Sequence, residues 1–180
     1  MAVRIAEVMH RSWPDEERVR KALSPFALTP EKIASTIGGC VHTPESYQQG
    51  GLQQFLASSI ERHLESALTI VDGLSSADNR YSPDLNEKAD FALAHDRSKP
   101  RVFFEVEFRP NVEKDLVKFQ IGANRGTLAA GVLVLAAERS NINAAYTTMP
   151  EYRKFSRIID ELRPSYPLLL VGIRIASDTA

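Results

Sequence analysis

The strongest constraint on the fold is a pair of short apolar segments, Lys88–Ala94 and Arg101–Phe108, that flank the turn-rich hexapeptide HDRSKP. Apolar runs of this length on either side of a turn predict a β-hairpin. Because alternate residues of a strand point to opposite faces, Glu105 and Glu107 are expected on the same face. Pairing across the turn places Asp90 opposite Glu105. The hairpin therefore predicts three carboxylates that converge on one patch of a sheet.

Such a patch has a chemical interpretation and a structural one. Like charges opposite each other destabilise a strand pair, so the cluster makes sense when a divalent cation neutralises it. Ligands that are all oxygen suit Mg²⁺, and its natural chemistry here is metal-assisted hydrolysis of a phosphodiester. In the alternative, Glu105 and Glu107 form the water-facing side of an antiparallel strand, with Asp90 a surface residue near the turn. The spacing alone leaves both interpretations open.

The rest of the chain alternates between helical and extended patterns, which predicts an α/β fold with a central mixed β-sheet flanked by helices. We expect helix over residues 1–24, interrupted at Trp13–Pro14, and a short helix capped by Thr29. Further helices are expected at 48–70, from Val112 to about Gly126 and at 148–162, with buried strands at 131–137 and 168–175.

Length and composition limit the class of protein. The 180 residues are enough for one domain, and the net charge of -1 excludes a uniformly basic nucleic-acid coat while allowing a local basic groove. The single cysteine, Cys40, cannot form an internal disulfide, which suits a reducing interior. The apolar runs are too short for a membrane span. We therefore expect a cytoplasmic protein without a membrane partner.

The order of the carboxylates resembles a known nuclease core. Asp90, then fourteen residues, then Glu105-Val106-Glu107 at the end of a strand before an amphipathic helix, is similar to the PD-(D/E)XK nuclease superfamily. Most of its members have lysine at the position of Glu107. The E-x-E variant, followed by FRPNVEKDLVKFQIG, resembles type II restriction endonucleases of the BamHI and BglII type. The resemblance implies a restriction endonuclease-like fold in one nuclease domain over residues 1–180, with a catalytic core at 50–175 and a helical N-terminal extension at 1–45.

Carried onto this sequence, the resemblance implies roles for individual residues. Asp90 and Glu105 would be metal ligands, and Glu107 would orient or deprotonate the attacking water. These families also place a glutamate on the preceding helix, where Glu65 is favoured over Glu61. The pair Pro83-Asp84 lies six residues before Asp90 and makes Asp84 an alternative ligand.

Basic residues follow the hairpin and recur on the later helix. They have two interpretations: contact with DNA phosphates, or water-exposed helix faces on which neighbouring acids dilute the positive field. Lys118, which faces the same end of the sheet as Glu107, stands out among them. The candidate DNA-binding residues are Arg109, Lys114, Lys118 and Arg153.

These expectations combine into a Mg²⁺-dependent endonuclease that hydrolyses DNA, with sequence-specific double-strand cleavage as in type II restriction enzymes. Cleavage of both strands of a symmetric site needs two active sites related by a twofold axis, so the expected partners are double-stranded DNA and a second copy in a homodimer. The alternatives are a DNA repair or phage-defence nuclease of low sequence specificity and a non-catalytic α/β protein-interaction module. Metal dependence would separate the module from both nucleases.

Overall fold

The computed structural model describes residues 3–42, 51–72, 74–95, 100–108, 112–137 and 151–177. Its strands are β1 (Val3–Trp13), β2 (Val41–His42), β3 (Ser75–Ser76), β4 (Phe91–Ala94), β5 (Arg101–Val106), β6 (Leu128–Ala136) and β7 (Leu168–Ser177). Its helices are α1 (Glu16–Leu23), α2 (Pro30–Gly38), α3 (Gly51–Asp72), α4 (Glu113–Asn124) and α5 (Tyr152–Leu162), with a 3-10 turn, η1 (Ser24–Phe26).

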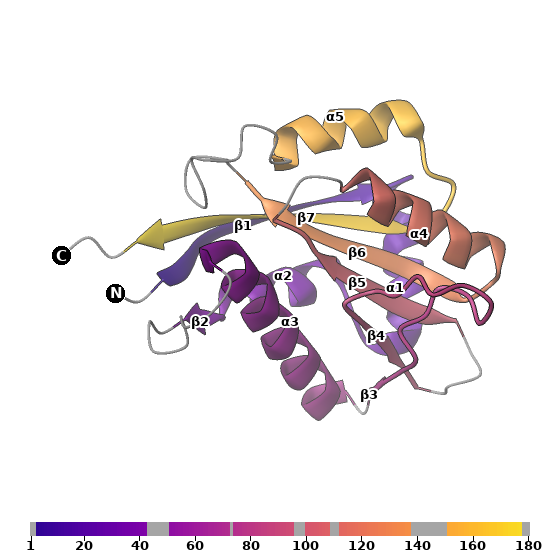
Figure 1. The fold of residues 1–180 in the computed structure, drawn as a ribbon, viewed down its shortest axis with the longest axis horizontal. Coiled ribbons are helices and arrows are strands. Elements are labelled where there is room, and N and C mark those ends of the chain that lie inside the picture. Colours follow the sequence, from indigo (N-terminus) through magenta and orange to yellow (C-terminus); the bar gives the residue numbers. More distant parts are fainter. Residues whose placement is uncertain are drawn as a thin grey trace.

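The strands form a mixed sheet with helices on both faces (Figure 1). Within the described residues the sheet has seven strands in the order β2-β1-β7-β6-β5-β4-β3. Its centre is parallel, because β5, β6 and β7 run in one direction, and its edges are antiparallel. Helices α1, α2 and α3 pack on one face, and α4 and α5 pack on the other. The predicted α/β class is confirmed.

The hairpin forms with the register that the sequence predicts. Strands β4 and β5 pair antiparallel, with Phe91 opposite Phe104 and Leu93 opposite Val102. The Phe91 and Phe104 rings stack with centroids 4.4 Å apart. Continued by one residue, this register sets Asp90 across from Glu105.

Strand β5 is buried on both faces. Val102, Phe104 and Val106 belong to the core under α1–α3, whereas Phe103 belongs to the core under α4 and α5. Glu105 points to the same side as Phe103 and is only 4% exposed. The alternative that makes this face the water-facing side of a strand is therefore wrong for Glu105.

The prediction of helix over residues 1–24 is wrong for its first half. Val3–Trp13 forms β1, which pairs antiparallel with β7 along its length. A bulge between Ile5 and Glu7 shifts the alternation, so Ile5 and Val8 pack against the same core. This spacing of three imitates a helical repeat, and the long-range pairing with β7 decides for a strand. The predicted N-terminal extension is therefore not purely helical.

The helices follow from their local sequence. In α2, Thr29 accepts a hydrogen bond from the backbone N–H of Lys32 and Pro30 occupies the first turn, as predicted. Helix α5 begins at Tyr152, and the earlier part of its predicted span lies outside the described residues. Among the described residues, no helix combines the length and apolar character needed to cross a membrane.

Candidate active site

Asp90 and Glu105 meet at the end of the β4–β5 hairpin opposite its turn. Glu105 lies in β5, whose carboxyl end adjoins the carboxyl end of the parallel strand β6. Asp90 directly precedes β4 and is exposed, and its Oδ2 accepts a hydrogen bond of 2.7 Å from the backbone N–H of Val106. The main chain of one strand thus fixes the carboxylate that begins the other. These two predicted ligands are brought together.

The Glu105 carboxylate is held by two side chains from different parts of the chain. The Tyr81 hydroxyl donates a hydrogen bond of 2.8 Å to Glu105 Oε1, and Lys118 Nζ donates one of 2.9 Å to the same oxygen. Tyr81 is fully buried, and it also stacks on Phe103 with ring centroids 4.5 Å apart. Neither hydrogen bond uses Glu105 Oε2. One oxygen is therefore anchored within the protein.

Lys118 also contacts a second buried carboxylate. Its Nζ lies 2.9 Å from Asp115 Oδ1, one helical turn earlier on α4. Asp115 is 1% exposed, and neither of its carboxylate oxygens has a well-directed hydrogen-bond partner. The ammonium group of Lys118 thus lies between two carboxylates, of Glu105 and Asp115.

The charges of this cluster do not balance. Burial raises the pKa of Glu105 to about 8, with the negative charges of Asp115 and Asp90 acting in the same direction and Lys118 acting against them. Burial also raises the pKa of Asp115. For Lys118, burial lowers the pKa, but the two carboxylates raise it by more, so the amine keeps its proton. Within the part of the chain that the structure describes, the Lys118 ammonium group lies between two buried carboxylates, and a further positive charge would stabilise the ionised form of Glu105.

The donor set fits a hard cation that keeps most of its water. Among the described residues, no three histidine, cysteine, aspartate or glutamate side chains are placed to hold a metal ion together. Asp90 and Glu105 supply two carboxylates, and Mg²⁺ in proteins is usually held by one or two, with water and substrate oxygens as its other ligands. The residues present therefore fit Mg²⁺ better than a metal that needs a complete protein cage.

Of the other predicted carboxylates, Glu107 lies near this edge of the sheet and Glu65 lies away from it. Glu107 follows the end of β5, is half-buried, and donates its backbone N–H to the carbonyl of Val134. Glu65 accepts a hydrogen bond from Ser76, whose strand pairs with Leu93 toward the turn of the hairpin. Glu65 is thus held toward the other end of β4 from Asp90. Glu61 lies one turn earlier on α3 and is half-buried.

The alternative ligand Asp84 lies on a different part of the surface. It is exposed, and its carboxylate is 3.9 Å from Arg125, which follows the last turn of α4. Asp115 lies in the first turn of the same helix. Asp84 is therefore at the opposite end of α4 from the Glu105 cluster.

The candidate DNA-binding residues differ in exposure. Lys114 and Arg153 are exposed in the first turns of α4 and α5. Both helices start beyond the carboxyl ends of β5 and β6, at the edge of the sheet near which Asp90 and Glu105 lie. Lys118 is only 12% exposed and contacts carboxylates instead. Arg109 lies outside the described residues.

Tyr81 and Asp115 are the members of the cluster that sequence reasoning missed. Tyr81 comes from a polar segment that otherwise suggests a surface loop, and a large aromatic residue within it was the available signal. Asp115 falls within the helical stripe formed by Val112, Leu116 and Phe119. An acidic residue at a buried helical position was therefore readable from the spacing.

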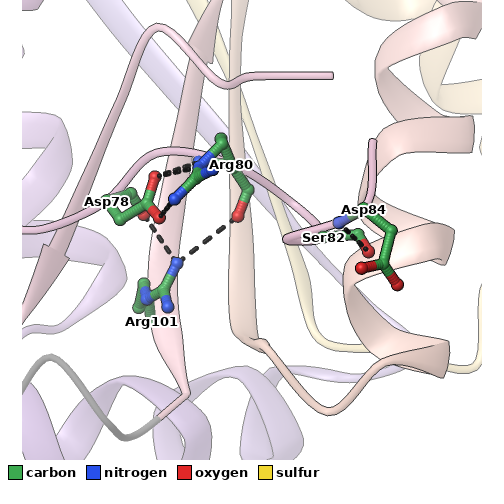
Figure 2. A network of polar contacts seen from close by, with 5 residues as sticks. All are labelled: Asp78, Arg80, Ser82, Asp84 and Arg101. Carbon is green, nitrogen blue, oxygen red and sulfur yellow. Dashed lines mark hydrogen bonds and ion pairs between the residues drawn. The ribbon is translucent and has the colours of Figure 1, made fainter. Parts of the chain in front are cut away.

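The segment that carries Tyr81 is held against the sheet by side chains that donate hydrogen bonds to its backbone carbonyls. Figure 2 shows Arg101, at the start of β5, donating to the backbone carbonyls of Asp78 and Arg80 at 2.7 and 3.4 Å. The Asp78 and Arg80 side chains also form an ion pair, 2.7 Å between Oδ2 and Nη2. Thr127 donates to the carbonyl of Tyr81. These contacts hold Tyr81 in place beneath Glu105.

The mixed sheet thus carries Asp90 and Glu105 at the end of the β4–β5 hairpin, and its fold is that of a restriction endonuclease. The fold is similar to that in a crystal structure of restriction endonuclease BglII complexed with a DNA 16-mer. The TM-score is 0.56 and the sequence identity 12%, over 96% of this chain and 80% of that chain. A search of curated proteins gave no match.

The family model for restriction endonuclease BglII/BglIII matches residues 5–173. The match begins inside β1 and ends inside β7, so it spans the central sheet. The chain belongs to this family, and it is accordingly a nuclease, a hydrolase of DNA phosphodiester bonds.

Proposed function

We propose that this chain is a Mg²⁺-dependent restriction endonuclease that cuts both strands of a specific DNA sequence as a homodimer. The observation that carries the proposal is the convergence of Asp90 and the buried Glu105 at one end of the β4–β5 hairpin, where the negative charges of Asp90 and Asp115 raise the pKa of Glu105. This arrangement favours a divalent cation next to a bound phosphodiester. A protein-interaction module has no need for a buried, positioned glutamate.

Each residue of the cluster has a defined task in this proposal. Asp90 and Glu105 would hold the ion, which when bound supplies the Lewis acid for attack on phosphorus. The N–H of Val106 orients Asp90, and the Tyr81 hydroxyl orients Glu105. Glu107, half-buried at the same edge, would accept a proton from the attacking water.

The DNA backbone would bind across the first turns of α4 and α5. Lys114 and Arg153 are exposed there, and the N-termini of helices favour anions. Contacts of this kind fix the position of the duplex without reading its sequence. Arg109 remains part of this proposal on the sequence alone.

A second copy of the chain would complete the enzyme, because cutting both strands requires two active sites. We assign this partner to an apolar groove between α4 and α5, an open pocket of about 420 Å³. Val117 and Leu162 line the groove and are 59% and 60% exposed. In this proposal, the two side chains would supply apolar contact area to the second copy.

The test is cleavage of long unmethylated DNA by the purified protein, with Mg²⁺ or with EDTA. We expect discrete fragments with Mg²⁺, none with EDTA, and none from Glu105→Ala. The matched control is Glu17→Ala, which removes an exposed glutamate from α1 on the opposite face of the sheet and is expected to cut as the wild type does.

Other outcomes would change the proposal in defined ways. A smear in place of discrete fragments would favour a repair or phage-defence nuclease of low specificity. Cutting that survives Glu105→Ala would show that the catalytic site lies elsewhere. Absence of cutting and of any Mg²⁺-dependent thermal shift would leave the protein without the proposed metal-dependent activity.

A further inference from the structure

Lys118 is placed differently from a lysine that contacts DNA. Its side chain is 12% exposed, and its ammonium group lies 2.9 Å from both Glu105 Oε1 and Asp115 Oδ1. A lysine ammonium has three N–H donors and no acceptor; here it donates a hydrogen bond to Glu105 Oε1 and pairs by charge with Asp115. Lys114, one turn earlier on the same helix, is exposed. The two lysines of α4 therefore have different surroundings.

Asp115 is unusual because stability does not explain it. A buried carboxylate is costly unless it is paired and hydrogen-bonded, and neither oxygen of Asp115 has a well-directed hydrogen bond. Apolar residues often replace buried ion pairs without loss of stability. The position of Asp115 next to Lys118 and the position of Lys118 next to Glu105 together suggest a task in the active site.

We propose that Lys118 is a positioning residue of the active site: held by Asp115, it fixes the Glu105 carboxylate and supplies from α4 a stationary positive charge that Glu107 cannot provide. The inference rests on the proposed function, because Glu105 is the residue that Lys118 positions. Asp115 acts through Lys118 and touches neither DNA nor the reacting atoms. With Tyr81, Lys118 fixes Oε1 and leaves Oε2 outside both hydrogen bonds.

Helix α4 is well suited to hold this arrangement. Asp115 and Lys118 are three residues apart and therefore share one face of the helix. Phe119, next to Lys118, is fully buried and lies directly over Gly131 of β6, where an added Cβ would come within 2.9 Å of the ring. The close approach of helix and sheet keeps the ammonium group at the depth of Glu105.

The test separates turnover from DNA binding. Lys118→Met is expected to lower the single-turnover cleavage rate at saturating DNA by about 10- to 100-fold, the usual effect of removing a group that orients a metal ligand. Its affinity for the same DNA in EDTA, measured by fluorescence anisotropy, is expected to stay within about twofold, because Lys118 makes no phosphate contact in this proposal.

Two comparison variants sharpen the result. Lys114→Met removes the exposed lysine of the same helix and is expected to weaken DNA binding and reduce the salt dependence by about one charge. Lys21→Met removes an exposed lysine from α1 and is expected to change neither quantity. If Lys118→Met behaves like Lys114→Met and keeps the wild-type rate at saturating DNA, Lys118 is a phosphate contact and the inference is overturned.

A double variant tests the role of Asp115, and it avoids the misfolding that an unbalanced buried charge could cause. Asp115→Asn combined with Lys118→Met removes one charge of each sign, so the buried net charge does not change. Because Asp115 acts through Lys118, the double variant is expected to cut no more slowly than Lys118→Met alone. A rate reduced by the product of the factors measured for Asp115→Asn alone and for Lys118→Met alone would overturn this dependence. Circular dichroism verifies that each variant is folded.

Glu105→Ala, run alongside, distinguishes failure of this inference from failure of the proposed function. Loss of cleavage in Glu105→Ala together with full cleavage in Lys118→Met would overturn the inference and leave the proposed function standing. Wild-type cleavage by Glu105→Ala would overturn both.

Discussion

Burial of Glu105 is the feature from which the chemistry of this site follows. A carboxylate removed from water favours its neutral form unless positive charge stands next to it. Lys118 provides one such charge, but Asp90 and Asp115 add two more negative charges nearby. Among the described residues around Glu105, negative charge therefore exceeds positive charge. A bound divalent cation would offset this excess and would lower the pKa of Glu105.

The shifted pKa of Glu105 predicts how stability depends on pH. Folding raises this pKa from 4.5 to about 8, so between these values the folded protein binds a proton that the unfolded chain has released. The free energy of unfolding of the metal-free protein is therefore expected to fall as the pH rises from about 5 to about 8. Urea unfolding in EDTA across this range measures it.

Glu105→Gln is the control, because glutamine keeps the shape of the protonated side chain and does not titrate. Its unfolding free energy is expected to depend less on pH than that of the wild type. Equal slopes for the two proteins would contradict a raised pKa at Glu105.

At the scale of elements, the position of α4 matters most for the site, because α4 carries Lys118 and Asp115. Gly131 lets α4 pack closely on the sheet, since it has no side chain. A Cβ at residue 131 would approach three atoms of the Phe119 ring at 2.9 to 3.1 Å. Gly131→Ala is therefore expected to destabilise the protein by about 1–3 kcal/mol and to lower the cleavage rate by displacing α4. Urea unfolding and single-turnover cleavage measure the two effects.

The second variant, Gly131→Ala with Phe119→Leu, is expected to recover part of the stability because the smaller side chain makes room. Gly38→Ala is the matched control: its Cβ would meet Val8 at 3.6 Å, an ordinary contact. Equal stability of Gly131→Ala and the wild type would contradict the close approach of α4 to the sheet.

The elements also show what local sequence can and cannot predict. The hairpin of β4 and β5 was readable, including its register, because a short turn and two apolar runs determine both. The strand at Val3–Trp13 was not, because its bulge gives a helical spacing and its partner β7 lies at the far end of the chain. The pairing of Asp90 with Glu105 follows from the hairpin, whereas the contacts of Tyr81 and Asp115 depend on tertiary packing.

At the scale of the whole molecule, the groove between α4 and α5 predicts the form of the assembly. Val117→Glu, at an exposed groove position, is expected to convert the proposed dimer to a monomer and double-strand breaks to single-strand nicks. Sedimentation and cleavage of supercoiled plasmid measure these outcomes. Leu85→Glu changes an exposed leucine outside the groove and is expected to leave the dimer intact. A monomeric wild type at the concentrations where it cuts both strands would contradict the proposed assembly.

The anchoring of the segment before β4 has a consequence for how this enzyme can evolve. Arg101 and Thr127 hold the segment by the backbone carbonyls of Asp78, Arg80 and Tyr81, and every residue has a carbonyl. Residues 83–88, which follow, are all exposed. Mutations can therefore accumulate at this tip while its base and the buried Tyr81 stay in place. The molecule thus places an exposed loop tip and a buried side chain of the proposed site within a dozen residues of chain.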